Sequence, residues 1–140
     1  MISRVAVGTD GSATAAEAVK EAADIARRYG AKLVLLSAFD DSGPGVAGGD
    51  NIERQWARSS RARTRSTLDG LEAELRQSGL ECETRSDHGD PADVLVRLAE
   101  EAGADLLVIG NKGIKRRVLG SVPNTVTHKA SCSVLVVKTT

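Results

Sequence analysis

The chain has 140 residues and no net charge, because 19 lysines and arginines balance 19 aspartates and glutamates. A chain of this length fits one domain, and a balanced charge gives no general attraction to nucleic acid or anionic membranes. No apolar run approaches the roughly 20 residues that a membrane helix needs, and the chain starts with a strand-like run and not a leader peptide. We therefore expect one cytoplasmic domain over residues 1–140 that binds neither nucleic acid nor membrane.

The first part of the chain alternates between strand-like and helical patterns. Residues 3–7 form a β-branched run, and a segment with a helical apolar stripe then extends to Gly30, which favours a left-handed helix end. Ser12 or Thr14 can cap the start of this helix. Residues 32–38 are apolar almost without alternation, which is typical of a strand covered on both faces.

The rest of the chain repeats this alternation. Residues 39–51 are rich in Asp and Gly and predict a loop, and a long polar helix follows over residues 52–78. Asp90 and Pro91 favour the start of another helix. Further strands are expected at residues 80–86, 105–109 and 133–137. Five strands that alternate with helices predict an α/β fold, a single doubly wound domain with a parallel sheet and helices on both faces.

Two glycine-containing turns follow the first and the fourth strands. The first turn begins with Gly8, Thr9 and Asp10, and the second contains Gly110 and Gly113. In an open parallel sheet, ligands bind beyond the carboxyl ends of the strands, where the strand order reverses. Because glycine lets backbone N–H groups approach an anion closely, the two turns predict an anion-binding edge of the sheet.

A helix start and a group of cations lie near the second turn. Gly120 and Ser121 open the last helix, whose free N–H groups and dipole favour a phosphate. The residues that could neutralise its charge are Lys112, Lys115, Arg116 and Arg117. These cations would equally suit a solvated surface, and Asp10 could serve only as a turn or capping residue. The sequence pattern alone leaves both interpretations open.

These segments resemble the universal stress protein family nearly from end to end. The similar segments are residues 7–12, 89–91, 104–110 and 134–137. The nucleotide-binding branch of the family carries the motif G-x2-G-x9-G-(S/T). Its fixed positions are occupied here by Gly110, Gly113, Gly120 and Ser121. The second spacer, residues 114–119, holds six residues in place of nine.

The resemblance implies a five-stranded sheet in the order 3-2-1-4-5 and an ATP-type site between the first and fourth strands. It also implies a homodimer that pairs through the last strand, Ser133–Val137. The nucleotide contacts that it implies are Gly8, Thr9, Asp10, Ala38, Ile109, Gly110, Gly113, Gly120, Ser121 and Val122.

The short spacer affects which nucleotide the loop could enclose. Three missing residues correspond to about 10 Å of extended chain, which is about the reach needed to cover a terminal phosphate. Either ATP binds with help from the nearby cations, and then with strong salt sensitivity, or the site prefers a nucleotide with fewer phosphates, such as AMP or cyclic AMP.

We therefore expect a stress-response or signalling protein that binds ATP or another adenine nucleotide, with or without Mg²⁺. The alternative is a nucleotide-free dimeric interaction module, which the short spacer favours. A phosphoacceptor domain of the response-regulator type would need an acidic pair where Asp10 stands alone. We expect no catalytic residues and no metal ligands, because His88 and His128 lie far apart and no nucleophile or metal-ligand spacing occurs. At most we expect slow ATP hydrolysis.

Overall fold

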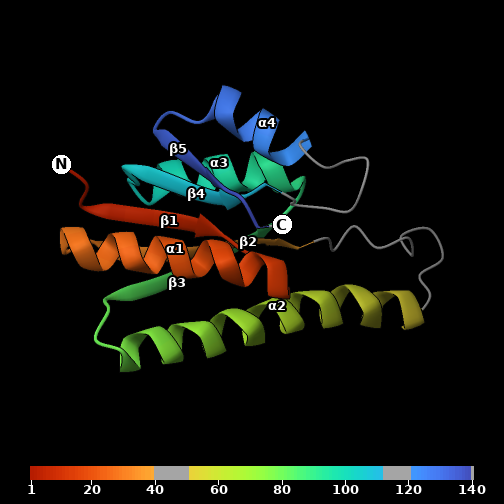
Figure 1. Ribbon diagram of the computed structural model, residues 1–140. Coiled ribbons are helices and arrows are strands. Elements are labelled where there is room, and N and C mark those ends of the chain that lie inside the picture. Colours follow the sequence, from red (N-terminus) through yellow and green to blue (C-terminus); the bar gives the residue numbers. More distant parts are fainter. Residues whose placement is uncertain (40–50, 112–120, 140) are drawn as a thin grey trace.

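The computed structural model contains a five-stranded parallel sheet in the order β3-β2-β1-β4-β5 (Figure 1). The structure describes residues 1–39, 51–111 and 121–139, and only the backbone of residues 51–60 and 121. The strands are β1 (Arg4–Gly8), β2 (Lys32–Phe39), β3 (Cys82–His88), β4 (Leu106–Gly110) and β5 (Ser133–Val137). The predicted fold class and strand order are confirmed.

Helices cover both faces of the sheet (Figure 1). One face carries α1 (Ala13–Tyr29) and α2 (Asn51–Gln77). The other carries α3 (Pro91–Glu101) and α4 (Ser121–Lys129). Within the described ranges, no helix combines the length and the apolar character that crossing a membrane requires.

Strand β1 lies at the centre of the sheet and is buried on both faces. Val5, Ala6 and Val7 have no exposed surface. Val5 and Val7 pack with the α1 and α2 side of the core, whereas Ala6 packs with the α3 and α4 side. This burial explains why the central strands are continuously apolar in sequence.

Helix α1 begins after a capping serine and ends at a left-handed glycine. The side chain of Ser12 accepts a hydrogen bond from the backbone N–H of Ala15 at 3.1 Å, so Ser12 and not Thr14 caps the helix. At the other end Gly30 has a φ of 66°, which is the left-handed conformation that glycine adopts without cost.

Several element ends differ from the prediction by one or two residues. Strand β3 begins at Cys82 and not at residue 80, β2 continues through Phe39, and α2 begins at Asn51. Pairing with the neighbouring strand β2 explains the shift. Strand β3 pairs with β2 along its whole length, from Cys82 opposite Leu33 to His88 opposite Phe39. The polar alternation of β3 carries little information about where this pairing starts.

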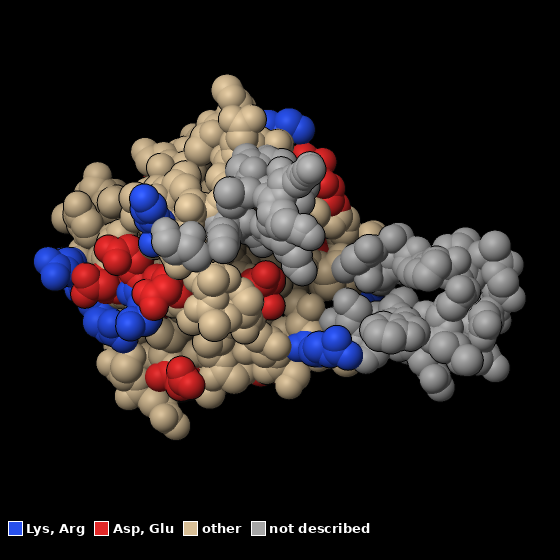
Figure 2. All heavy atoms as spheres, turned by 45° about the vertical axis from the view of Figure 1, so that its right-hand side comes forward, with Lys and Arg blue, Asp and Glu red and all other residues tan. Residues whose placement is uncertain are grey.

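Acidic and basic side chains are interspersed over the face of the molecule in Figure 2. Examples of surface ion pairs are Arg97 with Asp87 at 3.0 Å and Lys129 with Asp93 at 3.1 Å. Exposed pairs of this kind contribute little to stability.

A carboxylate ties β1 to β4 at the amino-terminal edge of the sheet. One oxygen of Asp105, Oδ2, accepts hydrogen bonds from the backbone N–H groups of Ser3 at 2.8 Å and Arg4 at 2.9 Å. The backbone N–H of Asp105 in turn donates to the carbonyl oxygen of Arg4 at 2.9 Å. The bonds from Ser3 and Arg4 hold the pKa of Asp105 below its usual value of 3.8.

We predict that Asp105→Ala lowers the Tm at neutral pH and that this loss shrinks in acid. The folded state lowers the pKa of Asp105, so its stabilisation is complete well above pH 3.8 and is lost as the pH falls through the folded pKa. Thermal unfolding followed by circular dichroism between neutral pH and about pH 3 measures the difference. Asp69→Ala, which removes an exposed carboxylate on α2, is the control. An equal loss of Tm at both ends of this pH range would contradict the prediction.

Candidate functional site

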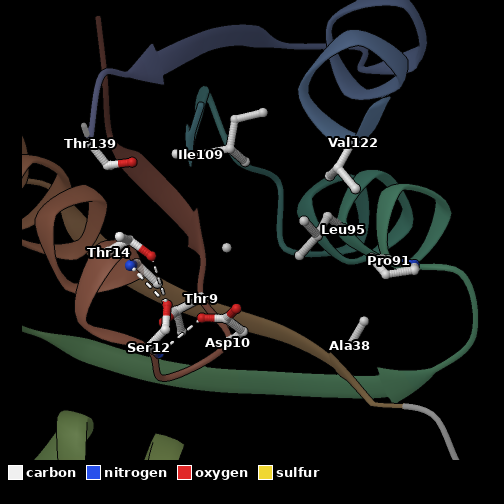
Figure 3. A pocket seen from close by; sticks show the side chains of 13 residues that line it. Thr9, Asp10, Ser12, Thr14, Ala38, Pro91, Leu95, Ile109, Val122 and Thr139 are labelled. Atoms are coloured by element: carbon white, nitrogen blue, oxygen red, sulfur yellow. Dashed lines mark hydrogen bonds between the residues drawn. The ribbon is translucent and has the colours of Figure 1, made fainter. Parts of the chain in front are cut away.

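The described residues enclose a cavity of about 160 Å³ at the carboxyl ends of β1, β2 and β4 (Figure 3). Strand β1 pairs with β2 on one side and with β4 on the other, so the chain order reverses at this point of the sheet. This is the position where doubly wound folds bind ligands. The lining residues are Gly8, Thr9, Asp10, Ser12, Thr14, Ala15, Ala38, Pro91, Leu95, Ile109, Gly110, Val122 and Thr139.

Hydrogen bonds to β2 and within the turn hold the turn after β1 in place. The backbone N–H of Thr9 donates to the carbonyl oxygen of Leu36 at 2.9 Å, and the Thr9 hydroxyl oxygen accepts from Gly11 N–H at 3.0 Å. Asp10 accepts from Ser12 N–H through Oδ1 at 2.9 Å. Asp10 is therefore a turn residue. Within the described part of the chain its second oxygen, Oδ2, takes part in no hydrogen bond and can accept one from a ligand.

The cavity has an apolar side and a polar side (Figure 3). Pro91 and Leu95 from α3 and Val122 from α4 gather on one side. The hydroxyl-bearing side chains Thr14 and Thr139 lie on the opposite side. Such a division suits a ligand with a flat apolar part and a polar part.

Glycine at the ends of β1 and β4 allows close packing around the cavity. A Cβ atom on Gly8 would lie 2.9 Å from Cδ1 of Leu95 and 3.6 Å from Cγ2 of Ile109. A Cβ atom on Gly110 would lie 3.3 Å from Cγ2 of Thr139. Any larger residue at these positions would push cavity-lining side chains out of place.

Gly11 is constrained both by its backbone and by helix α2. Its φ is +81°, and a Cβ atom would lie 2.8 Å from Cγ2 of Thr67 on α2. Helix α2 therefore packs directly against the turn that carries Asp10 and Ser12 into the cavity.

The structure brings most of the described sequence-predicted residues together. Those that line the cavity are Gly8, Thr9, Asp10, Ala38, Ile109, Gly110 and Val122. Gly113, Gly120, Lys112, Lys115, Arg116 and Arg117 lie outside the described residues. Ser121 begins α4, and its side chain also lies outside the described part of the chain. Placement around one cavity does not test ligand binding, which stays a prediction for all of them.

The sequence patterns do not assign six lining residues to the site: Ser12, Thr14, Ala15, Pro91, Leu95 and Thr139. For the first five the patterns indicate only helix-capping or core roles, although each lies within one or two turns of a strand end. Thr139 follows the last strand, and no sequence signal places it over the end of β4.

Neither histidine lines the cavity. His88 ends β3, where its Nδ1 lies 3.1 Å from Oδ1 of Asp87 and its ring lies 6.3 Å from that of Phe39. His128 is exposed near the end of α4. Among the described residues, no group of three or more His, Cys, Asp or Glu side chains could hold a metal ion.

Comparison with known proteins gives consistent matches over almost the whole chain. The model of the universal stress protein family matches residues 1–138. The universal stress protein Rv1636 of Mycobacterium tuberculosis is 38% identical, over 97% of this chain and 96% of its own. A universal stress protein solved in complex with cAMP is 32% identical, with a TM-score of 0.73 and coverage of 99% and 98% of the two chains. The universal stress protein from Archaeoglobus fulgidus in complex with dAMP is 25% identical, with a TM-score of 0.63 and coverage of 99% and 100%.

We predict that Gly11→Ala lowers the free energy of unfolding by about 1–3 kcal/mol, because a left-handed alanine is strained and its Cβ meets Thr67. Adding Thr67→Ser, which removes Cγ2, should recover the steric part of the loss. Urea unfolding measures both changes.

Gly70→Ala is the matched control, because a Cβ at this helical position meets nothing within 4 Å. Alanine there should raise stability by about 0.5–1 kcal/mol. If Gly11→Ala were as harmless as Gly70→Ala, the turn would not need its left-handed residue.

Proposed function

Since the chain belongs to the universal stress protein family, we propose that it is a stress-response or signalling protein that binds an adenine nucleotide at the carboxyl ends of β1 and β4. The observation that carries this proposal is the two-sided cavity at the point where the strand order reverses. The relatives solved with cAMP and with dAMP support the choice of nucleotide class.

The two sides of the cavity suggest how the nucleotide would lie. The base would pack on the apolar side against Ala38, Pro91 and Leu95, where a flat ring loses contact with water. The sugar would face the polar side, near Asp10. The phosphate would approach the amino terminus of α4, since Val122 in its first turn lines the cavity and the free N–H groups there favour an anion.

A nucleotide with a single phosphate fits this site better than ATP. The spacer at residues 114–119 is three residues shorter than in the family motif, so the loop has less backbone to wrap a terminal phosphate. Both nucleotides named for the structural relatives, cAMP and dAMP, carry one phosphate. ATP held by exposed cations of the loop is the competing proposal.

We predict that AMP or cyclic AMP binds more tightly than ATP and ADP in isothermal titration calorimetry at low and at high salt. Asp10→Asn should weaken binding about tenfold through the lost charged acceptor. An asparagine oxygen can still accept the turn bond from Ser12, so the fold should survive.

Glu101→Gln at the far end of α3 is the control and should leave affinity unchanged. Salt-insensitive ATP binding that is tighter than that of every monophosphate would contradict the single-phosphate proposal. Binding of no adenine nucleotide at all would favour the nucleotide-free interaction module.

We also propose a homodimer that pairs through β5. The two edges of the sheet differ in character. Edge strand β3 carries Glu83, Arg85 and Asp87, and charges protect an edge from pairing. Edge strand β5, Ser133–Val137, carries mainly valine and leucine, and Val136 is 39% exposed. A second copy placed on this edge would cover its apolar side chains and satisfy its unpaired backbone groups.

We predict that Val136→Lys weakens self-association of the protein. A charge on β5 would have to be buried against the second copy. Sedimentation equilibrium at micromolar concentration measures the change, and Thr84→Lys on β3 is the control that should leave association unchanged. A strictly monomeric unmodified protein would refute the proposed dimer.

A further inference from the structure

The chain beyond β5 folds back over the end of β4 and adds a residue to the cavity. Thr139 lines the cavity although it lies two residues past the last strand. Asn111 holds it there: the side-chain oxygen Oδ1 of Asn111 accepts from Thr139 N–H at 2.8 Å and from the Thr139 hydroxyl at 2.9 Å. The backbone N–H of Asn111 also donates to the carbonyl oxygen of Val137 at 2.9 Å. We call this set of bonds the Asn111–Thr139 clamp.

The clamp determines what the Thr139 hydroxyl can offer to a ligand. A backbone N–H can only donate, so the Asn111 atom that it faces must be the amide oxygen and not the amide nitrogen. That oxygen carries no hydrogen, so the Thr139 hydroxyl must use its single proton in the bond to it. The hydroxyl oxygen then retains only lone pairs, and toward the cavity Thr139 is an acceptor.

Asp10, on the turn after β1, has the same acceptor character as Thr139. It is exposed, and as a carboxylate it is an acceptor only. Lone pairs on Asp10 and Thr139 would repel phosphate oxygens but would attract neutral hydrogen-bond donors such as hydroxyl groups. Thr139 also lies on the side of the cavity away from Pro91 and Leu95, where a base would pack (Figure 3).

We infer that Thr139 is a specificity-determining residue that accepts a hydrogen bond from a ribose hydroxyl of the bound nucleotide, with Asn111 as the positioning residue that fixes its acceptor orientation. This inference rests on the proposed nucleotide site. It names the part of the nucleotide that the Thr139 side of the cavity recognises. It separates a sugar subsite lined by acceptors from a phosphate subsite lined by donors at the start of α4.

Two substitutions of Thr139 separate its hydroxyl from its methyl group. Thr139→Val keeps Cγ2, which packs over Gly110, and keeps the backbone N–H bond to Asn111, so only the hydroxyl is lost. Thr139→Ser keeps the hydroxyl and loses that methyl group. Thermal unfolding of both variants tests whether they fold like the unmodified protein.

The experiment measures the affinities of AMP, 2′-deoxy-AMP, 3′-deoxy-AMP and inosine monophosphate by calorimetry. We expect Thr139→Val to weaken AMP binding about tenfold, and Thr139→Ser to bind AMP nearly as well as the unmodified protein. With the deoxynucleotide that lacks the recognised hydroxyl, the unmodified protein and Thr139→Val should bind equally. Inosine monophosphate, which has the same ribose, should show the same loss as AMP.

Asn111→Ala tests the positioning role. It should reproduce the loss of Thr139→Val, with the same dependence on one ribose hydroxyl, and the double variant should lose no more than either single one. A merely structural role would weaken all four nucleotides alike.

Equal AMP affinity of Thr139→Val and the unmodified protein would overturn the inference while leaving the proposed function standing. A loss that is the same for all four nucleotides, or that is absent with inosine monophosphate, would also overturn it. If the unmodified protein bound none of them, the proposed function would fail and the inference with it.

Discussion

The position of β1 at the centre of the sheet is the constraint on which the rest of the molecule depends. Its side chains are buried on both faces, with Val5 and Val7 toward α1 and α2 and Ala6 toward α3 and α4. A strand in this position must pair on both sides, and it does so with β2 and β4. The end of β1 is therefore the place where connections to the two halves of the sheet diverge and leave room for a ligand.

Much of this architecture could be predicted from sequence because burial on both faces produces continuous apolar runs, as at residues 32–38. The ends of edge strand β3 are harder to predict from the sequence. Its side chains are polar, and pairing with β2 determines where the strand starts and stops. The turn at Gly8, Thr9 and Asp10 could be predicted because it directly follows a clear strand. Thr139 could not, because its place in the cavity depends on a contact with Asn111 that is 28 residues away in sequence.

The cavity combines surfaces of different chemistry that come from different elements. Helix α3 contributes apolar surface through Pro91 and Leu95, whereas the turn after β1 contributes the acceptor Asp10. Helix α4 contributes the positive end of its dipole. Because each surface belongs to a separate element, a substitution in one would change the preference of the proposed site for base, sugar or phosphate without rebuilding the others.

The unlike edges of the sheet would limit assembly of the proposed dimer. An isologous contact through β5 would use the apolar edge of both copies at once, and each copy would then present only its charged β3 edge outward. A sheet with two apolar edges could instead add copies without end, as fibres do. In the proposed dimer the charged β3 strand would oppose further sheet pairing, so growth through the sheet edges would stop at two chains.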